Sequence, residues 1–289
     1  MAFFIQFPHP GAEHKPPVNG RDKQWNVGNH ARKFLISRGT YVDSDLEPRD
    51  DELVFWGEWE PPSSIERRWA KSGRLPEALH RPYWMVPASA SFRQNTDPWV
   101  FGPTMHYSNC RQGRQTSSMQ RLGAGSIICF GSTIDGEFCV DTVFVVASSE
   151  PWTPAQAARV NAEAAFITCT AESLATSPRD ANGRYRLYRG ATLEQPVHGM
   201  FSFVPAHLAG SASARFRRPA ITLPGLINPA STQSPRGVND RLSLDRLHVA
   251  WSQICDQVLA ENLVMAVRFD IPEKRNGVAV IPPTARSGC

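Results

Sequence analysis

Carboxylates in unusual local surroundings are the side chains of this sequence best suited to chemistry. Asp97 lies in the segment 95–99 (NTDPW), where the proline that follows keeps the backbone of Asp97 out of the helical region. A carboxylate held in such a turn can orient a water molecule or stabilise a positively charged sugar, although an Asx turn uses the same residue types. Asn109 and His106 follow closely and are expected to complete this site.

Two glutamates stand at the end of an apolar run. The segment 53–60 (LVFWGEWE) indicates a strand, and alternation along it places Glu58 and Glu60 on one face. Because a buried glutamate is costly unless it is paired, each is expected to have either a function or an arginine partner. An arginine partner is the simpler explanation for Glu60, and Asp141, which opens the apolar run DTVFVV, has the same two explanations. We predict that Asp97 is the catalytic carboxylate and that Glu58 is its reserve.

Large aromatic rings interleave with amides and carboxylates in the segments 25–30, 55–60 and 95–99. Flat rings beside hydrogen-bonding groups suit a flat polar ligand such as a nucleobase, whereas anchoring of the core is the structural alternative for each segment. The residues expected to stack on the base are Trp25, Trp56 and Trp99, and those expected to read its edges are Asn26, His30 and Asn109. Histidines also cluster near the N-terminus, at His9, His14 and His30, without a metal-ligand spacing, and we expect no metal and no other cofactor.

Positive charge is concentrated in two windows. The net charge is only +4, but no acidic residue occurs in 98–134 or in 195–239. Such windows can follow a phosphate backbone, and ordinary arginine-rich loops are the alternative. The expected phosphate-binding residues are Arg111, Arg114, Arg215, Arg217 and Arg218.

Composition sets the class of protein. A chain of 289 residues with 41% hydrophobic residues can bury a substantial core. No apolar run approaches the roughly 18 residues of a membrane span, and the N-terminus lacks the basic start of a signal peptide. Six cysteines without a C-x-x-C pair argue against a zinc site and a disulfide framework, so we expect a cytoplasmic protein with reduced thiols.

Alternation and turn signals predict the strands. The strongest signal is a hairpin, in which two β-branched runs at 126–130 and 138–147 flank an Asp-Gly turn. Further strands are predicted at 3–7, 53–59, 186–189 and 264–271, and long loops at 61–94.

Capping and helical spacing predict the helices. Thr153 precedes Pro154, a favoured first residue, and begins a predicted helix that reaches about Leu174. A second begins near Ser243 and carries a structural apolar stripe, and a short helix is predicted at 29–37. The stripe consists of Leu244, Leu247, Trp251, Ile254 and Val258.

The mixed order of these elements favours an α+β fold in one domain. We expect residues 1–280 to form this domain, with a mixed or antiparallel sheet, a central β-hairpin and two main helices. The segment 281–289 is expected to be a flexible C-terminal tail.

One local pattern resembles a known family of DNA repair enzymes. The segment 96–99 (TDPW), followed by Gly-Pro and His106, resembles the water-activating loop of uracil-DNA glycosylases, which carries Gln-Asp-Pro-Tyr and a Gly-Pro turn. Residues 228–237 (NPASTQSPRG) resemble the minor-groove loop of that family, His-Pro-Ser-Pro, with Asn228 in the place of histidine. The resemblance implies that Asp97 orients the water and that Asn228 faces the leaving base. The chain departs from the family in its hairpin and in the polar residues before Asp97.

Three further resemblances set the functional hypotheses. The chain as a whole looks like bacterial antiphage glycosylases that excise glucosylated hydroxymethylcytosine from phage DNA. The hairpin that starts at Gly125 resembles the small-barrel, PUA-like modules that bind modified bases. The segments 188–190 (YRG) and 201–203 (FSF) resemble strands of ADP-ribosyltransferases, without a convincing downstream glutamate motif.

A DNA glycosylase is the function that these patterns favour. Its N-glycosidic bond breaks through a cationic sugar, which a carboxylate stabilises after the base has flipped into an aromatic pocket. The implied partner is phage DNA with modified bases. A non-catalytic reader of modified bases and an ADP-ribosyltransferase-like enzyme are the alternatives.

Overall fold

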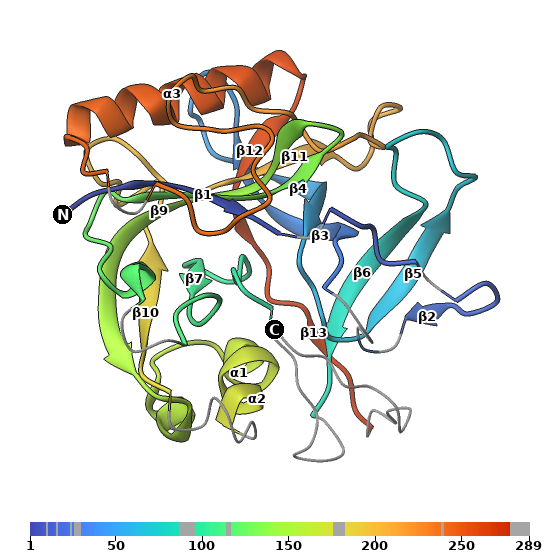
Figure 1. The fold of residues 1–289 in the computed structure, drawn as a ribbon. Coiled ribbons are helices and arrows are strands. Elements are labelled where there is room, and N and C mark those ends of the chain that lie inside the picture. The colour runs from blue at the N-terminus through green and yellow to red at the C-terminus, as the bar shows by residue number, and fades with distance from the viewer. Residues whose placement is uncertain are drawn as a thin grey trace.

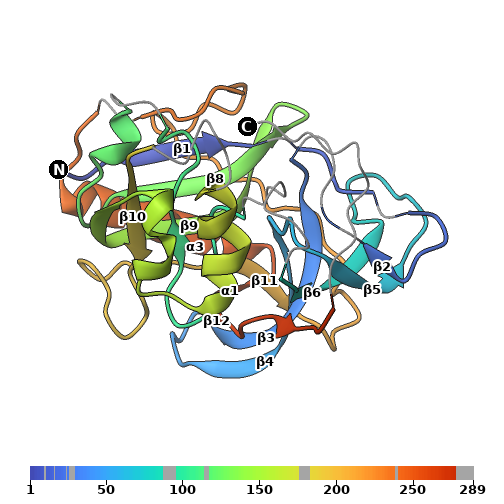
Figure 2. The same ribbon diagram turned by 90° about the horizontal axis from the view of Figure 1, so that it is seen from below.

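The computed structural model describes residues 1–9, 11–15, 17–23, 25, 30–86, 96–113, 117–175, 183–237 and 240–277. These residues form a single α+β domain, as the sequence predicts, built on two β-sheets (Figures 1 and 2). The predicted tail at 281–289 lies outside the described residues.

The first sheet is mixed and contains the predicted hairpin. Its strand β1 runs parallel to β8, and the remaining neighbours are antiparallel. Asp135 and Gly136 both have positive φ in the turn between β8 and β9, as a tight hairpin turn requires. In spatial order the strands are β1 (Phe4–Pro8), β8 (Ile127–Ile134), β9 (Glu137–Trp152), β10 (Tyr185–Gly190) and β7 (His106–Tyr107).

A β-bulge interrupts the hairpin at Asp141. Phe130 pairs with Thr142 and Gly131 pairs with Val140, so Asp141 has no partner residue on β8. A side chain at Gly131 would meet the carbonyl oxygen of Cys139 at 2.2 Å, which restricts this position to glycine. Because a bulge turns the extra residue out of the regular alternation, it can aim the Asp141 carboxylate away from its own sheet.

The second sheet contains a small closed barrel. Strand β12 pairs with both β11 and β3, and β4 joins the other edges of β11 and β3. The predicted hairpin belongs to the first sheet and therefore lies outside this barrel. The strands follow in the order β12 (Val264–Phe269), β11 (Val204–Leu208), β4 (Arg49–Gly57), β3 (Lys33–Val42), β6 (Ala78–Trp84), β5 (Ser63–Arg68) and β2 (Asp22–Lys23), and β13 (Glu273–Lys274) pairs with β6.

Two sequence predictions in this sheet are wrong. The short helix predicted at 29–37 is instead the start of β3, where Phe34, Leu35 and Ile36 are all buried. A strand covered on both faces has a continuous apolar run, which periodicity does not distinguish from a helix. The predicted loops at 61–94 contain β5 and β6. These two strands pair with each other, and β6 also pairs with β3, and this pairing outweighs their weak local pattern.

One of the two predicted main helices is regular. Helix α3 (Leu244–Ala260) begins where predicted, with the Ser243 hydroxyl accepting a hydrogen bond from the Arg246 backbone N–H. Its stripe is buried except for Leu244, and the Trp251 indole donates to the Phe201 carbonyl, which agrees with a structural role. Within the described ranges, none of the helices combines the length and apolar character that crossing a membrane requires.

The other predicted helix is broken. The backbone is extended at Val160 and Glu163, so a 3-10 helix at Pro154–Arg159 is separated from the next helical turns. Those turns are α1 (Ala164–Phe166), a π-helical turn at Ile167–Ala171 and α2 (Glu172–Ala175). The extended connection brings the Glu163 carboxylate to 3.6 Å from the buried His106 ring.

Candidate functional site

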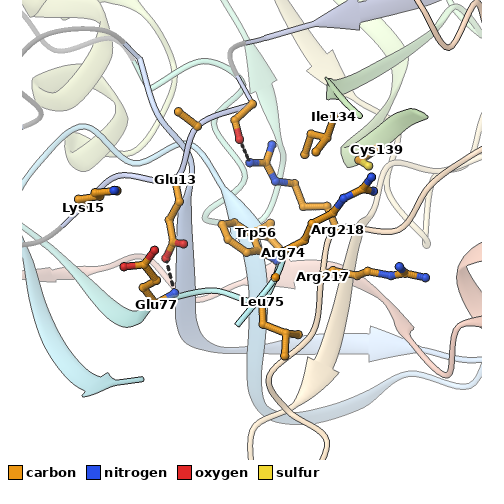
Figure 3. Close-up of a pocket in the computed structure, with 13 residues that line it drawn as sticks. Glu13, Lys15, Trp56, Arg74, Leu75, Glu77, Ile134, Cys139, Arg217 and Arg218 are labelled. Atoms are coloured by element: carbon orange, nitrogen blue, oxygen red, sulfur yellow. Dashed lines mark hydrogen bonds between the residues drawn. The ribbon is translucent and has the colours of Figure 1, made fainter. Parts of the chain in front are cut away.

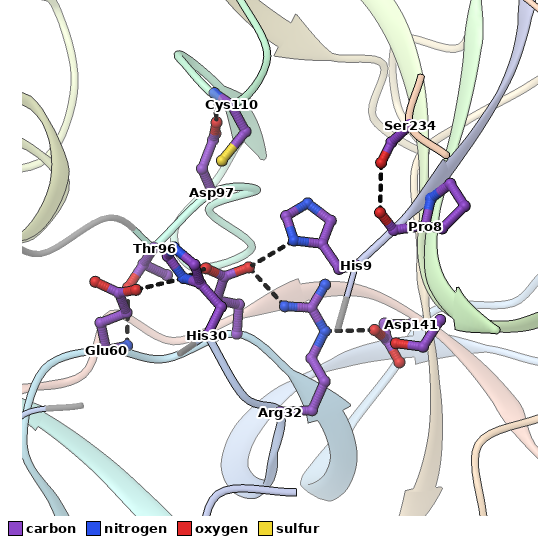
Figure 4. Close-up of polar contacts among 12 residues, drawn as sticks. Pro8, His9, His30, Arg32, Glu60, Thr96, Asp97, Cys110, Asp141 and Ser234 are labelled. Carbon is purple, nitrogen blue, oxygen red and sulfur yellow. Dashed lines mark hydrogen bonds and ion pairs between the residues drawn. The ribbon is translucent and has the colours of Figure 1, made fainter. Parts of the chain in front are cut away.

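A buried ion-pair network centred on Arg32 joins the two sheets (Figure 4). The Arg32 Nη1 donates to Glu58 Oε2 and its Nε donates to Asp141 Oδ2, both at 2.6 Å. Lys33 pairs with Gly57 in the β3–β4 register, so Arg32 and Glu58 face each other just beyond the paired strands. Asp141 approaches from the bulge in the other sheet. The three side chains are at most 2% exposed.

Arg32 and Glu58 keep their charges at neutral pH. Burial disfavours the Arg32 cation, but the Asp141 and Glu58 carboxylates hold the pKa of Arg32 above its ordinary value. Burial also disfavours the Glu58 anion, yet Arg32, followed by His30 and His9, lowers the pKa of Glu58 to about 2. Glu58 is therefore a fixed negative charge in a site with little water to screen it.

His30 and Glu60 lie where the network reaches the surface. The His30 Nδ1 is 2.7 Å from Glu60 Oε1 and 3.2 Å from Glu58 Oε1. The side chains of His30 and Glu60 are 16% and 7% exposed, against 1% for Glu58, so a ligand can approach from the His30 side. His9 borders the cluster, with its Nδ1 3.9 Å from Glu58 Oε2. This arrangement can hold a water molecule next to a fixed anion.

Arg218 connects the network to a neighbouring pocket of about 280 Å³ (Figure 3). The Arg218 Nη1 lies 3.7 Å from Asp141 Oδ1 and donates to the Ser132 hydroxyl at 2.6 Å. Its guanidinium carbon lies 4.9 Å from the Trp56 ring centroid, and both residues line the pocket. Arg217 is exposed at the same pocket, so the predicted phosphate-binding pair is adjacent to the network.

Asp97 is buried and its carboxylate is occupied by backbone donors. Its Oδ1 accepts from the Ser108 N–H at 2.8 Å and the Ser108 hydroxyl at 3.4 Å, and its Oδ2 accepts from the N–H groups of Asn109 at 3.0 Å and Cys110 at 2.7 Å. These contacts use the acceptor capacity of both oxygens. Burial raises the pKa of Asp97 to about 7, although the backbone hydrogen bonds act to lower it. The geometry gives Asp97 the role of holding the segment 108–110, and it favours Glu58 over Asp97 as the carboxylate that faces a ligand.

The three tryptophans predicted to stack on a base are all buried. Trp99 is 0% exposed, and its indole N–H donates to the Phe101 carbonyl. Its ring centroid lies 5.7 Å from that of Trp59, so Trp99 is part of the core. Trp25 is 1% exposed and also lies in the interior. Trp56 is 4% exposed but lines the pocket beside Arg218, which makes it the one of the three with a cavity surface among the described residues.

The amide side chains predicted to contact the base, where they are described, hydrogen-bond within turns. The Asn109 side chain donates to the Ser108 hydroxyl, and the Asn228 side chain accepts from the Ala230 backbone N–H. Asn228 is also held by the Gln6 side chain, which both donates to and accepts from its backbone. Asn26 lies outside the described residues.

The other predicted phosphate-binding arginines have unequal exposure. Arg111 is exposed, and its charge contributes to the lowered pKa of His9. Arg215 is held by the carbonyl oxygens of Pro76 and Ala70 and stacks over Trp69. Arg114 lies outside the described residues.

The residues that resemble ADP-ribosyltransferase strands make structural contacts in and next to the first sheet. Arg189 pairs with Glu150 at 2.8 Å, and the buried Ser202 hydroxyl donates to the Val145 carbonyl at 3.2 Å. The Tyr188 hydroxyl donates to the Met119 carbonyl in the interior. These contacts account for the polar groups of the motif without a ligand.

Local sequence does not place Arg32 and His9 in one cluster with Glu58. Arg32 precedes a strongly apolar strand, and His9 follows the first strand directly. A charged residue next to an apolar strand is the signal that could identify Arg32, as it identifies Glu58, Glu60 and Asp141.

Three buried histidines are expected to make the protein unstable in acid. Burial, the largest cause in each case, lowers the pKa of His9 and of His14 to about 3 and that of His80 to about 2. Below about pH 6.5 the unfolded chain binds these protons and the folded chain does not, so the free energy of unfolding falls. Asp97 opposes this below about pH 7, because the folded state takes up its proton first.

We expect a net loss of roughly 3 kcal/mol in the free energy of unfolding between about pH 6.5 and pH 5. Urea titrations at the two pH values measure it. The variant His80→Gln, which keeps a partner for the Ser63 hydroxyl, should flatten the slope by about 1.4 kcal/mol per pH unit. A free energy that does not change over this interval would contradict the assignment of neutral buried rings.

Comparison of the chain with protein-family models, with curated proteins and with solved structures found no match in any of the three.

Proposed function

We propose that this protein hydrolyses the N-glycosidic bond of a modified nucleobase in DNA. The observation that carries the proposal is the position of Glu58, an anion fixed by Arg32 and placed behind the more accessible Glu60 and His30. A sugar that loses its base becomes cationic, and a preorganised carboxylate stabilises that charge. The resemblance of the chain to antiphage glycosylases selects DNA with modified cytosines as the substrate and phage defence as the setting.

Each residue of the cluster has a role in this proposal. Glu58 faces the cationic sugar, and Glu60 accepts a proton from the attacking water, which His30 helps to hold. The distances of 2.7 and 3.2 Å from His30 Nδ1 to the two carboxylates bring these groups within reach of one water molecule. Arg32 and Asp141 fix the orientation of Glu58 rather than contacting the substrate.

Positive groups near the cluster suit the phosphates of a DNA strand. Arg111 is exposed and lies close enough to His9 to affect its pKa, and Arg217 is exposed at the pocket beside Arg218. Arginine charges on two sides of the cluster would bind the phosphates that flank a flipped nucleotide. Such binding weakens as the salt concentration rises.

Duplex DNA that carries glucosylated hydroxymethylcytosine tests the proposal, with unmodified DNA of the same sequence as the control. We expect the protein to release the modified base and leave abasic sites, which alkali converts into strand breaks. Salt-dependent binding of the modified DNA without abasic sites would instead identify a reader of modified bases. Transfer of label from NAD that depends on Arg189 would identify the ADP-ribosyltransferase alternative.

A further inference from the structure

Three side chains that are suitable metal ligands converge at the accessible side of the network. The His30 Nδ1 lies 2.7 Å from Glu60 Oε1 and 3.2 Å from Glu58 Oε1, and one ligand atom from each of the three residues lies within 4.8 Å of the others. Neighbouring ligands bound about 2.1 Å from one cation lie about 3 Å from each other. The two short separations are those of direct ion pairs, and they also match the spacing of ligands around one cation.

The two oxygens of Glu58 face different partners. Its Oε2 accepts from Arg32 Nη1 at 2.6 Å, whereas its buried Oε1 faces His30, with the Nδ1 at 3.2 Å. A buried carboxylate oxygen normally has a donor or a cation beside it. The side chain is 1% exposed, and a cation between Oε1 and His30 Nδ1 would satisfy both atoms.

His9 lies at the border of the three converging side chains. Its side chain is 9% exposed and its Nδ1 is turned to Glu58 Oε2 at 3.9 Å (Figure 4). The other ring nitrogen, Nε2, is buried and has no hydrogen-bond partner within the part of the chain that the structure describes. A second imidazole, stacked on Phe7, therefore borders the three converging side chains.

We propose that His30, Glu58 and Glu60 bind one divalent transition-metal ion, with His9 at its edge. One imidazole nitrogen and two carboxylate oxygens form a mixed set of donors that suits ions such as Mn²⁺. The partial exposure of His30 and Glu60 provides an entry path, and Arg32 fixes the buried ligand Glu58 from behind. The inference uses the side chains of the proposed active site but goes beyond the proposed reaction, because the ion can bind whether or not the protein cleaves DNA.

Binding of Mn²⁺ to the full-length chain tests this inference. The protein is treated with EDTA, dialysed and titrated with Mn²⁺, and the free ion is followed by electron paramagnetic resonance. We expect one ion per chain in the wild type and an affinity at least about 100-fold lower in Glu60→Gln and in His30→Gln, because each loses a direct ligand. Asp51→Asn is the control, because Asp51 is an exposed carboxylate outside the network, and the affinity of this variant should stay within about threefold of wild type.

The outcomes separate the metal site from the proposed reaction. No Mn²⁺ binding by folded wild-type protein, or equal binding in Glu60→Gln and His30→Gln, overturns the inference. Base release that continues in EDTA, together with no Mn²⁺ binding, removes the metal site and leaves the glycosylase proposal in place. Specific Mn²⁺ binding without release of any base leaves the metal site in place and removes the proposed function. Thermal melting of each variant establishes that it is folded.

Discussion

Glu58→Gln should reduce the rate of base release by about 1,000-fold on DNA with modified cytosines. Removing a preorganised electrostatic group from an active site costs on the order of 100- to 1,000-fold. Here the lost group is an anion that Arg32 holds ionised, with a pKa of about 2, and that no water screens effectively. The glutamine keeps the size of the side chain, so the change removes charge rather than packing. Single-turnover assays of alkali-sensitive sites measure the effect.

Asp141→Asn is the matched control for this variant. Glu58 and Asp141 each accept from Arg32 at 2.6 Å and each is almost fully buried, so both substitutions leave Arg32 with one carboxylate partner. Removing one partner of a buried ion pair destabilises by about 3 kcal/mol or more, and we expect similar losses in the two variants. Only Glu58 lies beside His30, so its substitution should reduce activity far more than that of Asp141, which acts only through Arg32. Equal rates in the two folded variants would show that Glu58 acts only through stability.

Asp97→Asn should destabilise the protein by roughly 3 to 5 kcal/mol near pH 8. Three backbone N–H groups and one hydroxyl contact the two carboxylate oxygens. An asparagine presents an NH₂ group in place of one oxygen, so the N–H groups that donated to this oxygen lose their acceptor. Each buried unsatisfied group costs about 1 to 3 kcal/mol. Urea unfolding measures the loss, and Asp51→Asn, at an exposed position with one backbone contact, should change stability by less than about 0.5 kcal/mol.

The kinetics of Asp97→Asn separate the two roles considered for this residue. If Asp97 holds the segment 108–110, the variant that is folded at low temperature should retain base release within about tenfold of wild type. A stable variant with no base release would restore Asp97 as the residue that orients the water. The comparison with Glu58→Gln under the same conditions identifies which carboxylate the reaction uses.

Local sequence was sufficient for elements whose determinants lie close together along the chain. The hairpin has its Asp-Gly turn between two β-branched runs, and α3 has its cap and its apolar stripe within one segment. Each of these features favours its structure without help from distant residues. The predicted helix at 29–37 is wrong for the opposite reason, because pairing with β4 and β6 decides its conformation.

Local sequence identifies four carboxylates that stand out along the chain: Glu58, Glu60, Asp141 and Asp97. The partners of each carboxylate depend on the fold. Arg32 meets Asp141 across 109 positions of sequence, and only the strand register and the bulge bring the two together. Asp97, the predicted catalytic carboxylate, is a buried acceptor whose donors come from the segment 108–110. Burial and ion pairing act through space, so a pattern along the chain identifies the charges but not their partners.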